Sequence, residues 1–239
     1  MQKMTRKHIM VLAAMCASIV ASVGLVNNIA GLFLTPMAEE FGVGRGDVSL
    51  TLTISSLICA VGGSVMPKVM GKFPFKPVVL IAVIIVSGST FLMGFSNSLA
   101  MIYALNAIRG FAAGFTGTVI ATTTLTRWFH RSTGLMTSIA MGFSGVAGAI
   151  FSPIFTHLIQ SVGWRVSFYI CAVLMAIFSL PIILFPIALT PEAAGTRSYG
   201  DVEGSSAVTP QELSKHQPAP SKPPVFLFVT VVIFALAAG

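Results

Sequence analysis

One arginine, Arg109, lies within an apolar stretch of the sequence that runs from Leu99 to Leu125. About ten residues of this stretch precede it, which as a helix would cover roughly 15 Å and bring the guanidinium near mid-membrane. An arginine at that depth costs about 2.5–3.5 kcal/mol on insertion scales, so we expect it to face the protein interior or a water-filled cavity. There its planar fork of N–H donors would suit a carboxylate.

Two amides, Asn27 and Asn28, lie in another apolar stretch, Ile9–Phe33. Amides buried among membrane helices usually hydrogen-bond to a neighbouring helix. They could also line a cavity and bind a carboxylate or a hydroxyl group. We therefore take Arg109, Asn27 and Asn28 as candidate substrate-binding residues. The apolar stretches contain no acidic residue, so Arg109 has no obvious ionic partner among them.

The stretches that carry these residues indicate an all-α membrane protein. The 239 residues are 55% hydrophobic and only 9% charged, whereas a soluble domain has about 25% charged residues. The apolar runs have the length that crosses a bilayer as a helix, and they do not alternate in polarity as barrel strands do. We expect a bundle of six transmembrane helices, with spans near Ile9–Phe33, Val48–Met66, Pro77–Phe95, Leu99–Leu125, Gly134–His157 and Val166–Ile187.

After these spans the composition changes. We expect a six-helix part over 1–189, followed by a polar, proline-rich linker over 190–223. A new apolar run begins at Pro224 and reaches Gly239, which is short for a crossing. We interpret 224–239 as the start of a seventh helix, and we expect the sequence to be a fragment of a longer protein.

The basic residues predict which way the chain crosses the membrane. The net charge of +7 suits the cytoplasmic loops of a membrane protein better than a nucleic-acid surface. The outer loops would hold only Arg45 and Arg165. The N-terminus and linker are therefore expected in the cytoplasm, with the chain a multi-pass protein of the plasma or inner membrane. The other side would hold eleven basic residues: Lys3, Arg6, Lys7, Lys68, Lys72, Lys76, Arg127, Arg131, Arg197, Lys215 and Lys222.

Three motifs resemble those of a known transporter family. "RGFAAGFTG", from Arg109 to Gly117, resembles the fourth-helix motif of the major facilitator superfamily. "RWFHRSTGLMTSIAMGFSGVAGAIFSP" and the later "GWR" at Gly163–Arg165 resemble the oxalate/formate antiporter and monocarboxylate porter branch. The resemblance implies the N-terminal half of that fold, which would rock against a C-terminal half around a small-molecule site. Arg109 could then bind an anionic substrate, serve the family's coupling or gating role, or be structural.

The resemblance also implies a set of residues for gating and conformational change. Between spans two and three, the loop "PKVMGKFPFKP" carries basic residues where the family has them, but Gly71 stands in place of the usual aspartate. We therefore carry over the location of this loop and not its switch chemistry. Small residues spaced by four along spans four and five would let helix backbones approach closely. The expected set is Lys72, Lys76, Gly110, Gly114, Arg127, Arg131, Gly142, Gly145, Gly148 and Pro153.

The sequence contains no phosphate-binding glycine loop, zinc-protease motif or credible triad, so an enzyme is not expected, and neither is a cofactor or metal. We predict a secondary transporter of a small organic anion, working in the lipid bilayer together with a C-terminal half. The alternative is a membrane-embedded interaction or assembly protein without transport of its own.

Overall fold

The fold is described from a computed structural model, which describes residues 6–129 and 132–184. These residues belong to the first of two compact units, Met1–Gly200. The expected linker over 190–223, the expected seventh helix over 224–239 and Arg131 lie outside the described residues.

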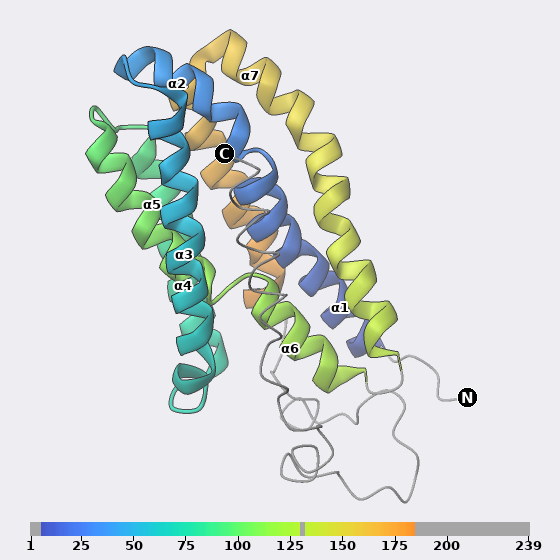
Figure 1. The fold of residues 1–239 in the computed structure, drawn as a ribbon. Helices are drawn as coiled ribbons and strands as arrows, with labels where there is room; N and C mark the ends of the chain where they lie inside the picture. The colour runs from blue at the N-terminus through green and yellow to red at the C-terminus, as the bar shows by residue number, and fades with distance from the viewer. Residues whose placement is uncertain (1–5, 130–131, 185–239) are drawn as a thin grey trace, which may run out of the picture. The chain divides into compact units, whose positions relative to one another are not determined.

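All the described elements are helical (Figure 1). Helix α5 packs against α3 and α4, while α7 packs against α1, η1, α4 and α6. In chain order the elements are α1 (Arg6–Ile19), η1 (Val20–Asn28), η2 (Ala30–Phe33), α2 (Leu34–Phe41), α3 (Arg45–Met70), α4 (Phe75–Met93), α5 (Leu99–Ala113), α6 (Thr118–Trp128) and α7 (Thr133–Leu184).

Five helical segments of the described chain are long and apolar enough to cross a membrane: Arg6–Phe41, Arg45–Met70, Phe75–Met93, Leu99–Trp128 and Thr133–Ile182. The last segment contains the fifth expected span and the part of the sixth from Val166 to Ile182. The chain of this segment reverses direction at Gly163, whose φ is 85°. Glycine adopts such a positive φ readily because it has no Cβ. Figure 1 shows the two arms of α7 meeting there. The count of six spans stays a prediction.

Two of the expected continuous spans are interrupted. The first changes from α-helix to the π-helix η1 and then to the 3₁₀-helix η2. The expected span Leu99–Leu125 is in fact two helices, because α5 ends at Ala113 and α6 begins at Thr118. Glycines on both sides of the break, Gly114 and Gly117, relax the backbone between them. The sequence pattern missed both interruptions because apolar residues continue on both sides of each of them.

The break between α5 and α6 is compensated by a neighbouring side chain. Ser18 of α1 donates a hydrogen bond of 2.8 Å to the backbone carbonyl of Thr116. Irregular backbone at membrane depth is tolerated only where protein groups satisfy it, since lipid offers no partner. The hydroxyl of Ser18, which is buried, therefore helps to fix the point where the fourth expected span bends.

The buried apolar side chains form two clusters, one towards each end of the bundle. One cluster joins Met15 on α1 with Met66 on α3 and Trp128 on α6. The other joins Phe33 with Met93 and Trp164, close to α2 and the reversal of α7. The polar residues of the candidate site, on the middle of α5, lie within the second cluster, which also contains Leu25 of η1 and Ile102 and Leu105 of α5.

Candidate functional site

Arg109 lies on α5 and is only 5% exposed. Its Nη2 donates a hydrogen bond of 2.6 Å to Oδ1 of Asn106, one turn earlier on the same helix. Its Nε has no hydrogen-bond partner among the described residues. Because a guanidinium has five N–H donors, the protein leaves most of them unused.

Asn106 holds the arginine in this orientation. Its Nδ2 donates to the carbonyl of Ile102 at 3.1 Å, so its Oδ1 is turned towards Arg109. Asn106 is itself 3% exposed. A neutral amide fixes the position of the guanidinium without cancelling its charge. The described acidic residues, Glu39, Glu40 and Asp47, do not line the cavity at Arg109.

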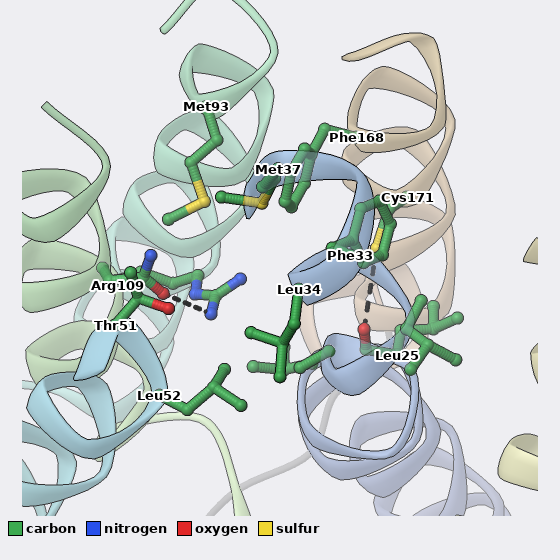
Figure 2. A pocket seen from close by; sticks show the side chains of 14 residues that line it. Leu25, Phe33, Leu34, Met37, Thr51, Leu52, Met93, Arg109, Phe168 and Cys171 are labelled. Atoms are coloured by element: carbon green, nitrogen blue, oxygen red, sulfur yellow. Dashed lines mark hydrogen bonds between the residues drawn. The ribbon is translucent and has the colours of Figure 1, made fainter. Parts of the chain in front are cut away.

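Arg109 borders a small cavity between η1, η2, α2, α3, α5 and the second arm of α7. The space that water can reach there is about 30 Å³, enough for one or two water molecules. Figure 2 shows the guanidinium on one side of the cavity, with Leu34 and Phe33 across from it. Apart from Arg109, its polar lining comes from Thr51, Asn106 and Cys171. An organic acid does not fit until the helices around this cavity separate.

Cys171 ties the second arm of α7 to the π-helix. Its Sγ lies 3.6 Å from the carbonyl oxygen of Leu25, as the dashed line in Figure 2 shows. A π-helix forms i to i+5 hydrogen bonds and often marks a functional site. Here it places Leu25, Val26 and Ile29 along the wall of the Arg109 cavity.

The two predicted asparagines do not border the Arg109 cavity. Asn27 lines a separate groove of about 440 Å³ between η1, α3 and the α5–α6 break. Asn28 donates a hydrogen bond of 2.7 Å from Nδ2 to the carbonyl of Ser144 on α7. The polar lining of the groove is uncharged and comprises Ser22, Asn27, Ser55, Ser56, Cys59, Ser64 and Thr118.

The glycines expected to act in conformational change separate into two groups. Gly110 and Gly114 face the backbone of α3, and a Cβ on Gly114 would lie 2.7 Å from the carbonyl carbon of Gly62. A Cβ on Gly148 would lie 3.0 Å from Nδ2 of Asn28. A Cβ on Gly142 or Gly145 would meet nothing within 4 Å among the described residues. Gly142 and Gly145 therefore do not belong to the packed face of α7 among the described residues. The sequence pattern, by contrast, places both among the small residues that let helix backbones approach closely.

The remaining gating candidates lie near the helix ends or on the surface. Lys72 and Lys76 are exposed at the turn between α3 and α4, and Arg127 is exposed near the end of α6. Pro153 is exposed within the first arm of α7. In the described part of the chain, no group of histidine, cysteine and acidic side chains could hold a metal ion.

Sequence reasoning missed a polar cluster at the end of the bundle where α2 meets the reversal of α7. Arg165 donates to Oε1 of Glu40 from Nη2 at 2.7 Å and from Nε at 3.1 Å. Its Nη1 donates to the carbonyl of Ser96 at 2.7 Å. Nε1 of Trp164 donates to Oε2 of Glu40 at 2.5 Å. We call Glu40, Ser96, Trp164 and Arg165 the clasp.

The clasp joins three segments that are distant in the sequence: α2, the α4–α5 loop and the reversal of α7. "GWR" was the available signal, since Gly163 permits the turn and the next two residues donate the hydrogen bonds. Glu40 gave no such signal, because an acidic residue beside a loop is ordinary. Trp164 of the clasp and most of the lining of the Arg109 cavity belong to the same apolar cluster.

Comparison with known proteins gives one family. The Major Facilitator Superfamily model matches residues 11–239. The uncharacterized MFS-type transporter YcxA of Bacillus subtilis (strain 168) is 22% identical over 163 residues, which cover 67% of this chain and 40% of the relative. The purine ribonucleoside efflux pump NepI of Escherichia coli (strain K12) is 24% identical over 155 residues, which cover 65% of this chain and 39% of the pump.

This chain thus spans about two fifths of the length of these curated relatives. Neither relative is named as an oxalate/formate antiporter or a monocarboxylate porter, so that branch stays a prediction. The family is one of transporters and not of catalysts, in agreement with the sequence.

Proposed function

Because the chain belongs to the major facilitator superfamily, we propose that it forms part of a secondary transporter that moves a small organic anion, such as a monocarboxylate or dicarboxylate. The transporter works by alternating access, with this helical half rocking against a second half. The proposal concerns the whole transporter, so its tests use the complete reading frame that contains these 239 codons.

The observation that carries the proposal is the unbalanced charge of Arg109. The side chain is 95% buried, is hydrogen-bonded only to a neutral amide, and has an unpartnered Nε. A buried cation without an anion beside it is costly, and a bound carboxylate removes that cost. The small cavity corresponds to a closed conformation, and substrate enters when α2, α3 and α7 move apart.

A second candidate substrate class is a neutral polar solute. Two observations favour it: the groove beside Asn27 has an uncharged polar lining, and one relative is a purine ribonucleoside efflux pump. In this alternative Arg109 serves coupling or structure, and the solute binds through hydroxyl and amide groups. The non-transporting alternative, a membrane-embedded assembly protein, requires neither site to bind solute.

The test is uptake into proteoliposomes that contain the complete protein. We expect labelled small carboxylates to accumulate, with unlabelled carboxylates competing and purine ribonucleosides without effect. Empty liposomes control for leak. Uptake of a nucleoside but of no carboxylate would replace the anion by the neutral solute. If neither class is taken up by protein shown to be folded, the assembly alternative stands.

The proposed orientation, with the N-terminus in the cytoplasm, rests on the larger number of lysine and arginine residues in the loops of that side. In this orientation the clasp lies outside the cell. Ser96 is fully buried under the clasp. In a background without native cysteines, Ser96→Cys should react slowly with an impermeant thiol reagent added to intact cells. Adding Arg165→Gln, which removes the ion pair with Glu40, should speed that reaction about tenfold, because an ion pair with several hydrogen bonds closes the site.

Lys72→Cys serves as the control at the opposite end, and it should react only after the cells are permeabilised. Reaction of Lys72→Cys in intact cells would contradict the orientation. An unchanged rate at Ser96→Cys when Arg165 is replaced would show that the clasp does not hold this end closed.

A further inference from the structure

An apolar cleft of about 330 Å³ opens on the surface of the bundle between the facing ends of α3, α4 and α5. It lies at the end of α3 that contains Met66, whose cluster also contains Met15 of α1 and Trp128 of α6. Its lining contains no charged side chain and comprises Val69, Phe73, Pro77, Val78, Ile81, Ala82, Ile85, Phe111, Ala112 and Phe115.

Three lysines are sequence neighbours of residues that line this cleft. Lys68, Lys72 and Lys76 each directly precede a residue of its lining, namely Val69, Phe73 and Pro77. All three lysines are exposed, and none has an ion pair or hydrogen bond among the described residues.

Among the described residues, no acidic side chain lies at the end of α3 that carries these lysines. The described acidic residues, Glu39, Glu40 and Asp47, belong to α2 and the start of α3, at the opposite end of α3. Gly71 stands where the resemblance leads one to expect an aspartate within this loop. The loop therefore presents three ammonium groups beside an apolar cleft, without a carboxylate of its own.

We propose that this cleft binds an anionic phospholipid, with an acyl chain against Ile81 and Phe111 and the phosphate at the three lysines. Basic residues next to membrane helices attract anionic lipids, each contributing about fivefold to affinity near the surface. A zwitterionic lipid offers the same acyl chain, but its own ammonium offsets the attraction. A soluble anion offers the charge without the apolar part that the cleft accommodates.

The shape of the cleft explains why a lipid would stay there longer than elsewhere on the surface. Phe73 is 59% exposed and Ile81 is 56% exposed. The ring of Phe73 and the methyl groups of Ile81 are therefore available to a lipid acyl chain that enters from the bilayer. The floor is made by Ala82 and Ala112, which are small and leave the depth open. A bound lipid would thus join the α3–α4 turn to α5.

The experiment measures lipid retention by native mass spectrometry on the complete purified protein, offered equal amounts of phosphatidylglycerol and phosphatidylcholine. We expect phosphatidylglycerol to be retained preferentially. Replacing Lys68, Lys72 and Lys76 together by glutamine should lower that preference about tenfold or more. Replacing the same three by arginine should preserve it, because the positive charge remains.

A matched pair of variants tests the cleft itself. Ile81→Trp fills the cleft and should reduce phosphatidylglycerol retention. Ile84→Trp is the control, since Ile84 is 61% exposed on the same helix but does not line the cleft. Equal retention in both tryptophan variants, or an unchanged preference in the glutamine variant, would overturn the proposal. Neither readout depends on transport, so the result stands apart from the proposed function.

Discussion

Gly114→Leu should abolish folding of the helical bundle, and Gly114→Ala should weaken it. A Cβ at this position would lie 2.7 Å from the carbonyl carbon of Gly62 and 2.8 Å from the carbonyl oxygen of Cys59. Both atoms belong to the backbone of α3, so no side-chain rotation can make room. Overpacking of this kind costs about 1–3 kcal/mol for small insertions and more for large ones. Without the hydrophobic effect, close packing is what joins helices in lipid.

The measurement is the yield of monodisperse protein in detergent, followed by its thermal unfolding. Gly142→Leu is the matched control, because a Cβ at Gly142 would meet nothing within 4 Å in the described chain. We expect the control to match wild type. Gly148→Ala should fall between the two, since the contact there is the amide of Asn28, which can move. If Gly114→Leu gives the yield and melting temperature of wild type, the close approach of α3 and α5 is not needed for folding.

The general character of the fold could be predicted from the sequence because apolar run length has one physical cause, the thickness of the hydrocarbon layer. That reasoning placed Arg109 inside the bundle correctly. It could not place the breaks in the first and fourth spans. The π-helix at Val20–Asn28 and the interruption after Ala113 depend on which carbonyls other helices satisfy, as Ser18 does for Thr116. Those partners lie far away in the sequence.

The candidate site was predictable only in part for the same reason. Arg109 stands out because a charge in an apolar run is costly wherever it lies. Asn106 does not stand out in the sequence, because a single neutral amide near an arginine is common on helices and does not by itself indicate a hydrogen bond between the two. The sequence grouped Asn27 and Asn28 with Arg109 because all three are polar residues within apolar spans, whereas the structure sends Asn27 into the groove and Asn28 to Ser144. Depth in the membrane does not fix the direction in which a side chain points.

Arg109→Gln should abolish carboxylate uptake by the complete transporter while the protein still inserts and folds. Glutamine keeps a polar side chain of similar length but removes the charge that the anion neutralises. Hydrogen bonds to charged groups contribute about 1.5–3 kcal/mol each, so binding should weaken at least tenfold to a hundredfold. Arg109→Lys keeps the charge and loses the planar fork, and it should retain some uptake with weaker binding.

Asn106→Asp separates the possible roles of Arg109 more sharply. It puts a carboxylate where Oδ1 now lies 2.6 Å from Nη2, and so it neutralises the arginine without removing it. If Arg109 binds the anion, this variant should fold at least as stably as wild type and lose uptake. If Arg109 is structural, the same variant should be stabilised by the new ion pair and transport normally. If Arg109 serves gating alone, equilibrium binding should persist in Arg109→Gln and Asn106→Asp while exchange slows.

The measurements are uptake of labelled carboxylate, equilibrium binding and thermal unfolding, each normalised to inserted protein. Asn106→Leu is the matched control, because it removes the amide that positions Arg109 without supplying a charge. It should weaken binding less than Asn106→Asp, since the guanidinium keeps its charge and loses only its fixed orientation. Wild-type binding and uptake by Arg109→Gln would end the role of Arg109 as a substrate ligand, whatever the aspartate variant does.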